Sequence, residues 1–159
     1  MDICEPGGLT VSKAKTYQEI LDEKGYLIIA PSGRSMWPLI RENKDAIKLV
    51  PPGMIKKRDI ILYQRKNGDY LVHRVIQLSR GSFVLCGDNQ WKLEKDITSK
   101  MVLAVMEGYF RKERYRSVNH MGYRIYSRIW VAFRWTRFIR DKVKNVFRSA
   151  FGSRVKDED

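Results

Sequence analysis

The stretch Gly33-Arg34-Ser35-Met36-Trp37-Pro38 directly follows a short apolar run, Tyr26-Leu27-Ile28-Ile29-Ala30. Gly33 can adopt backbone conformations that are closed to other residues, and Pro38 fixes its own φ and restricts the residue before it. The pattern predicts a strand over residues 26–30, followed by a constrained turn that carries Ser35. Because catalytic side chains often lie on loops held by a rigid scaffold, Ser35 is a candidate nucleophile. The alternative is a polar turn with an incidental serine.

The chain beyond this turn alternates between apolar runs and turn signals. Further runs rich in apolar or β-branched residues cover residues 46–50, 59–63, 70–78, 82–86 and 101–106. The turn signals between them are Pro51-Pro52-Gly53, Lys66-Asn67-Gly68-Asp69 and Arg80-Gly81-Ser82. Asn-Gly is a strong hairpin signal, and short strands at this spacing indicate antiparallel pairing. We therefore predict a mainly β fold, a compact antiparallel β domain over residues 26–112.

Two of the later runs carry polar residues that a serine nucleophile needs. His73-Arg74 lies in the run 70–78, and Gly87-Asp88-Asn89 follows the run 82–86. Strand alternation puts His73 on one face with Leu71 and Val75, and Arg74 on the other. A serine hydroxyl needs a base to remove its proton, and histidine has an unperturbed pKa of about 6.5 that suits this task. The alternative is a hydrogen-bonded histidine on a half-buried face.

The order Ser-Met-x-Pro, a charged turn with a strand (residues 58–63), His-Arg-Val and Gly-Asp-Asn resembles the type I signal peptidase superfamily. That superfamily includes signal peptidase I and the self-cleaving repressor domains, and the resemblance covers roughly Tyr26 to Arg111. Histidine stands where most bacterial members carry a lysine base, so the chain looks like the Ser-His branch of endoplasmic-reticulum and archaeal signal peptidases. The resemblance implies a serine endopeptidase that cleaves leader or signal peptides, with Ser35 as nucleophile, His73 as base, and no metal or cofactor.

The resemblance also implies an acid that orients His73. Asp88 is the first candidate, slightly favoured over Glu94, which falls where some histidine-type relatives carry the acid. The alternative for Asp88 is an ordinary turn residue that bonds nearby backbone. With Asp88 as the orienting acid, Asp88→Asn is predicted to reduce turnover strongly and to leave the fold intact.

Two further features of the cleft follow from the same comparison. The backbone N–H of Ser35 is the predicted oxyanion donor, and Gly33 stands where some bacterial relatives add a serine hydroxyl. Met36 and the strand around Ile28 are predicted to line a cleft that binds an extended peptide by strand addition. Ordinary core packing is an equal alternative for Met36.

The two ends of the chain differ from the middle. Residues 1–25 form an N-terminal segment with a helix predicted over Ser12–Lys24, capped by Ser12 and ended by Gly25. Residues 113–159 are predicted to form a basic amphipathic helical tail, because apolar residues recur at three-to-four spacing between Ser117 and Phe151. The same stretch contains eight basic residues and one acid, Asp141.

Arginines interleaved with aromatic residues suit a helix that lies on an anionic membrane surface. Packing of the helix on the β domain, with a solvated basic face, is the main alternative, and binding of nucleic acid is the less favoured one.

Composition limits the remaining choices. The chain has 159 residues, a net charge of +13 and two cysteines, which indicates one domain, an anionic partner and no disulfide scaffold or metal-ligand cluster. No stretch approaches 18 apolar residues, so we predict no transmembrane helix and a cytoplasmic or peripheral membrane location. A non-enzymatic protein held to membrane or nucleic acid by the tail is one alternative. A self-cleaving regulator of the same fold is another, although the N-terminal segment is too short for a helix-turn-helix domain.

Overall fold

The computed structural model describes residues 16–133 together with residues 136, 139, 142 and 143. Its elements in chain order are α1 (Tyr17–Lys24), β1 (Leu27–Ile29), β2 (Asp45–Val50), β3 (Ile60–Gln64), β4 (Tyr70–Ser79), β5 (Ser82–Cys86), β6 (Glu94–Thr98), the 3₁₀ helix η1 (Ser99–Met101), β7 (Val102–Arg111), β8 (Arg114–Ser117) and α2 (Met121–Ala132). The strands pair antiparallel in one sheet of order β1-β2-β7-β3-β4-β5-β6, and β8 pairs with β7. The predicted mainly β fold with a short N-terminal helix and a C-terminal helix is confirmed.

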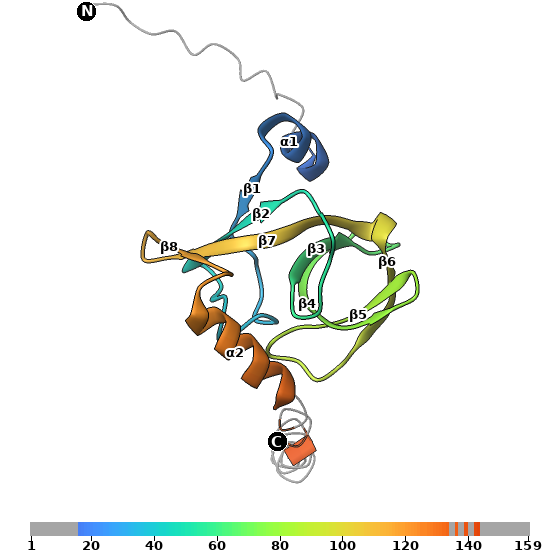
Figure 1. Ribbon diagram of the computed structural model, residues 1–159, viewed down its shortest axis with the longest axis vertical. Helices are drawn as coiled ribbons and strands as arrows, with labels where there is room; N and C mark the ends of the chain where they lie inside the picture. The colour runs from blue at the N-terminus through green and yellow to red at the C-terminus, as the bar shows by residue number, and fades with distance from the viewer. Residues whose placement is uncertain (1–15, 134–135, 137–138, 140–141, 144–159) are drawn as a thin grey trace, which may run out of the picture.

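The sheet curls, and α1 and α2 lie on opposite sides of the β domain (Figure 1). Pairing shifts register at four places, between Lys48 and Leu49, Leu62 and Tyr63, Val75 and Gln77, and Phe83 and Leu85. Irregularities of this kind bend a strand and increase its twist. The curl divides the apolar interior into two clusters. One contains Ile47, Leu49, Leu62 and Met106, and the other contains Ile61, Val75, Leu85 and Ile97.

The local turn signals predict the structure well. Residues 65–69 close the β3–β4 hairpin, in which Gly68 has a φ of 92° and donates to the carbonyl of Arg65 at 2.9 Å. Gly25 ends α1 in the left-handed conformation, with a φ of 72°. The cap at the start of α1 is Thr16, which forms a reciprocal capping box with Glu19. Ser12, the predicted cap, lies outside the described residues.

Two strands were not predicted from the sequence. β6 reads Glu-Lys-Asp-Ile-Thr, and only Ile97 in it is buried, so it carries too little alternation to be recognised. β8 contains two arginines and was assigned to the helical tail, whereas it pairs with β7 from Gly108↔Ser117 to Arg111↔Arg114. The prediction that the helical tail starts at residue 113 is therefore wrong, because residues 114–117 extend the sheet.

The predicted C-terminal helix is confirmed over Met121–Ala132, and its inner face packs on the β domain. Tyr123 Oη accepts a hydrogen bond from Arg74, Tyr126 Oη donates to the carboxylate of Asp88, and Trp130 Nε1 donates to the backbone carbonyl of Asp88. Most of the predicted helix beyond residue 133 lies outside the described residues. No helix in the described part of the chain is both long enough and apolar enough to span a membrane.

Candidate active site

Ser35 lies in the turn that follows β1, as predicted. Gly33 takes a φ of 84°, a conformation that favours glycine, and its N–H donates to the Glu42 carboxylate at 2.5 Å. The carbonyl of Ser35 accepts a hydrogen bond from the N–H of Asn89 at 2.7 Å. These contacts hold the turn on both sides of Ser35, whose side chain is half-buried. The Gly33 N–H is bonded to Glu42 and is not free to bind an oxyanion. The N–H of Ser35 therefore stays the predicted oxyanion donor.

Gly87 brings the Ser35 turn next to the strand that carries His73. An added Cβ at Gly87 would lie 2.7 Å from the Ser35 carbonyl oxygen and 3.1 Å from the Ser35 Cβ, so only glycine fits there without a shift. In the antiparallel β4–β5 ladder Arg74 pairs with Cys86. Continuing this register by one residue sets Gly87 across from His73. Ser35 therefore lies against Gly87 at the end of the β4–β5 ladder that carries His73, with no hydrogen bond between Ser35 Oγ and His73 Nε2.

His73 sits on β4 with its imidazole buried. Its Nδ1 lies 3.0 Å from Tyr63 Oη, and Tyr63 and Val75 belong to the same side of the curled sheet. Arg74 faces the other way, toward Asp88. The predicted alternation of β4 is thus confirmed.

Hydrogen-bond directions identify the protonated nitrogen of His73. Tyr63 Oη donates to Glu94 Oε2 at 2.5 Å, so the Tyr63 oxygen must accept from His73 Nδ1. Nδ1 therefore carries the proton of the neutral ring, and Nε2 keeps its lone pair. Nε2 is buried, and within the described structure it has no hydrogen-bond partner. Such a nitrogen is ready to accept a proton.

Glu94, and not Asp88, is the acid next to His73. A Glu94 oxygen lies 3.5 Å from His73 Nδ1, and Tyr63 links the two residues by hydrogen bonds. Asp88 instead accepts two hydrogen bonds of 2.7 Å from the buried guanidinium of Arg74. The prediction that Asp88 orients His73 is therefore wrong, because Arg74 takes both of its carboxylate oxygens. The alternative acid, Glu94, occupies the orienting position.

Burial favours the neutral form of His73. Burial lowers the pKa of His73, Arg65 also lowers it, and Glu94 and Asp88 act against this by raising it. Burial alone would raise the pKa of Glu94, but hydrogen bonds from Arg65 and Tyr63 outweigh it, so the pKa is lowered. Burial and the Glu94 hydrogen bond raise the pKa of Tyr63 above its usual range, so its hydroxyl stays protonated. At neutral pH the site thus combines a neutral base with an ionised carboxylate.

A pocket of about 180 Å³ opens beside Ser35. Ser35 and Met36 line one side, Leu71 and Val72 of β4 line another, and Tyr17 and Tyr70 contact each other edge-to-face at its rim. Met36 also belongs to the larger apolar cluster, so cleft lining and core packing both apply to it. The β1 residue that lines the pocket is Ile29, whereas Ile28 is exposed.

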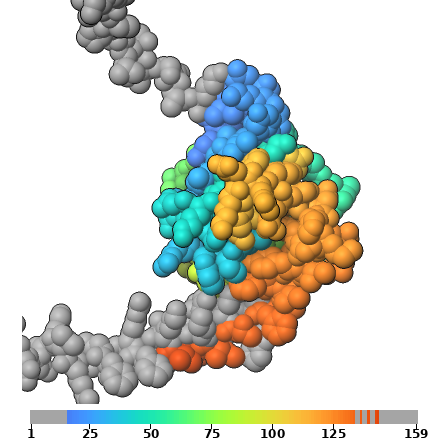
Figure 2. Space-filling view, turned by 90° about the vertical axis from the view of Figure 1, so that its left-hand side faces the viewer, coloured from blue at the N-terminus to red at the C-terminus, as the bar shows by residue number. Residues whose placement is uncertain are grey.

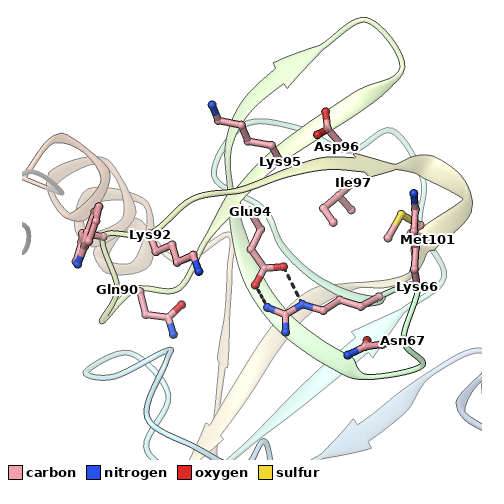
Figure 3. A pocket seen from close by; sticks show the side chains of 11 residues that line it. Lys66, Asn67, Gln90, Lys92, Glu94, Lys95, Asp96, Ile97 and Met101 are labelled. Carbon is pink, nitrogen blue, oxygen red and sulfur yellow. Dashed lines mark hydrogen bonds and ion pairs between the residues drawn. The ribbon is translucent and has the colours of Figure 1, made fainter.

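A second, wider pocket of about 760 Å³ lies on the Glu94 side of His73. Figure 3 shows the Glu94 carboxylate inside it, joined to Arg65, with Lys92 pointing toward the same space. Lys66, Lys95 and Asp96 also line this pocket, so basic residues outnumber acidic ones around it.

Tyr63 and Arg65 were not recognised from the sequence. A signal for Tyr63 was present, since the Asn67-Gly68 turn sets Ile61 opposite His73, and Tyr63 is two residues further along on the same face. Arg65 carried no signal, because its contact with Glu94 joins β3 to the start of β6, which was not predicted.

Within the described residues, no group of three or more His, Cys, Asp or Glu side chains is arranged to hold a metal ion. Comparisons with protein-family models, with curated proteins and with solved structures find no match for this chain.

Proposed function

We propose that the protein is a serine endopeptidase similar to signal peptidase I, with Ser35 as nucleophile and His73 as general base. One observation carries the proposal. His73 Nε2 is buried and unpartnered, and Nδ1 is bonded through Tyr63 to the ionised Glu94. A histidine that only stabilised the fold would leave a buried lone pair unsatisfied at a cost of about 1–3 kcal/mol. A base that awaits a substrate-bound serine accounts for it, since catalytic hydrogen bonds often tighten only when substrate is bound.

In the proposed reaction the Ser35 oxygen attacks a peptide carbonyl carbon while its proton passes to His73 Nε2. The new imidazolium is stabilised through Tyr63 by the Glu94 carboxylate, and the N–H of Ser35 binds the oxyanion. Nε2 then gives the proton to the leaving amine as the C–N bond breaks, and an acyl-serine remains. A water molecule, deprotonated by the same nitrogen, hydrolyses the ester and frees Ser35.

The pocket beside Ser35 favours a small side chain near the scissile bond. Its volume of about 180 Å³ suits residues such as alanine or valine more than large aromatic ones, and Met36, Leu71 and Val72 are among its lining residues. An extended peptide bound along a strand would point every second side chain toward the face of this pocket, and one of those side chains would enter it.

The proposal is tested by incubating the purified chain with a mixed peptide library and reading the cuts by mass spectrometry. We expect cuts after small apolar residues, and none with Ser35→Ala. A matched control is Ser79→Ala, which changes an exposed serine at the end of β4, outside this pocket, and should cut like the unaltered chain. If the chain cut only itself and no library peptide, the self-cleaving regulator would be favoured. If Ser35→Ala cut the library as well as the unaltered chain does, the proposal would be contradicted.

The pH profile of cleavage gives a second prediction, with opposite signs for two variants. His73 must be neutral to act as a base, so kcat/KM falls as the pH drops through its pKa, which burial sets below about 6.5. Glu94→Gln removes a charge that raises the pKa of His73, so the acidic limb should move to lower pH. Arg65→Met removes a charge that lowers it, so the limb should move to higher pH. If the acidic limb of the pH profile lay at the same pH in both variants, the proposed role of His73 would be contradicted.

A further inference from the structure

The outer face of α2, turned away from the β domain, presents a row of exposed apolar side chains. They lie four residues apart and are between 51% and 73% exposed. The row consists of Met121, Ile125 and Ile129 of α2 and its C-cap residue, Phe133. At about 100° per residue these positions fall within one third of the helix circumference. We call this row the outer stripe; α2 (orange) forms part of the molecular surface in Figure 2.

The fold itself does not account for the outer stripe. The opposite face of α2 already packs on the β domain through Tyr123, Tyr126 and Trp130, which contact Arg74 and Asp88. A helix that only covered the domain would present polar residues on its solvent side. Exposed apolar residues that form a continuous patch mark an interaction surface, whereas single ones need no explanation.

Positive charge borders the outer stripe. Arg124 and Arg128 are exposed and lie one turn apart, along one edge of the stripe. From Met121 to Phe151 the sequence contains eight basic residues and one acid, and the whole chain has a net charge of +13. An apolar stripe with arginines at its edge matches the boundary between lipid tails and anionic headgroups, where guanidinium groups bind phosphate while apolar side chains enter the acyl layer.

We propose that the outer stripe of α2 is the surface by which the protein binds an anionic lipid bilayer. A second copy of the chain fits less well, because two stripes in contact would bring the arginines of one helix close to those of the other. Nucleic acid would match the charge but would leave the apolar row in water. The inference does not depend on peptidase activity, since α2 binds lipid in the same way whatever the site does.

The test is sedimentation of the full chain with vesicles of phosphatidylcholine alone or mixed with phosphatidylglycerol. We expect binding to the mixed vesicles that weakens between 50 and 500 mM salt, set against little binding to the neutral ones. Each basic residue near an anionic surface contributes about 1 kcal/mol of attraction. Arg124→Glu with Arg128→Glu should therefore weaken binding by at least about tenfold. The matched control, Arg80→Glu with Lys100→Glu, makes the same change in net charge at exposed positions elsewhere.

The apolar part of the surface is tested in the same assay. Ile125→Glu with Ile129→Glu should abolish binding, whereas Met54→Glu with Leu78→Glu, which alters exposed apolar residues elsewhere, should lower it only slightly. All four positions are exposed, so the thermal unfolding temperature should change little in either pair, and circular dichroism checks this. Equal loss in stripe and control variants would overturn the proposal. So would a lipid-free dimer in light scattering that the stripe variants dissociate, or duplex DNA that displaces the protein from vesicles.

Discussion

Ser35→Ala and His73→Ala are each expected to reduce peptide cleavage by at least about 10²-fold, and the double variant should be little worse than either. General-base assistance contributes about 10²–10⁴-fold, and a nucleophile and its base act as one unit, so their losses do not add. The measurement is kcat/KM on one cleaved peptide for the two single variants and the double. Tyr63→Phe should cause a smaller loss, because the imidazole keeps its place but loses the hydrogen bond to Nδ1 and its link to Glu94.

The chain offers a matched control for each substitution. His120, the other histidine, is exposed and caps α2 by accepting a hydrogen bond from the N–H of Gly122, so His120→Ala should keep normal cleavage. Ser79→Ala serves in the same way for Ser35. If His73→Ala retained cleavage, a lysine base would be the next candidate. Every lysine in the described part of the chain is at least partly exposed, including Lys56 and Lys57, which does not suit a base that needs burial to act at neutral pH.

What the sequence predicts correctly is mostly local. The turn around Gly33, the hairpin at Asn67-Gly68 and the alternation along β4 each depend on a few consecutive residues, and each is confirmed. Such features follow from φ preferences and from the two-residue period of a strand, which act without help from distant parts of the chain.

The errors concern contacts between residues far apart in the sequence. Asp88 was assigned to His73 by its motif, but the choice between His73 and Arg74 depends on which face of β4 the Gly87-Asp88-Asn89 turn reaches. The start of the tail at residue 113 was wrong for a similar reason. The pairing of β8 with β7 decides where the sheet ends and the tail begins. A strand of four residues is too short for its periodicity to reveal that pairing.

The Arg74–Asp88 pair joins the candidate site to α2. Both side chains are fully or almost fully buried, at 0% and 2% exposure, and they form two hydrogen bonds of 2.7 Å. Arg74 also donates to the backbone carbonyl of Arg58 and to Tyr123, and α2 reaches Asp88 through Tyr126 and Trp130. The residue after Asp88, Asn89, donates its N–H to the carbonyl of Ser35, so the same turn also holds the loop that carries Ser35. A change in the pair is therefore expected to affect both the fold and the position of the nucleophile.

Asp88→Asn and Arg74→Met are each expected to lower the free energy of unfolding by about 3–5 kcal/mol, because each leaves one charged or polar group buried without its partner. This reverses the sequence-based expectation that Asp88→Asn leaves the fold intact. The double variant Arg74→Met with Asp88→Asn should lose less than the two single losses combined, since no unpaired charge remains. Urea unfolding of the three variants measures these differences. The control is Lys48→Met, which breaks the surface pair with Glu107 and should lower the free energy of unfolding far less than either single variant. Single losses as small as that of Lys48→Met would mean that water reaches the Arg74–Asp88 pair, and α2 could not then be the element that seals it.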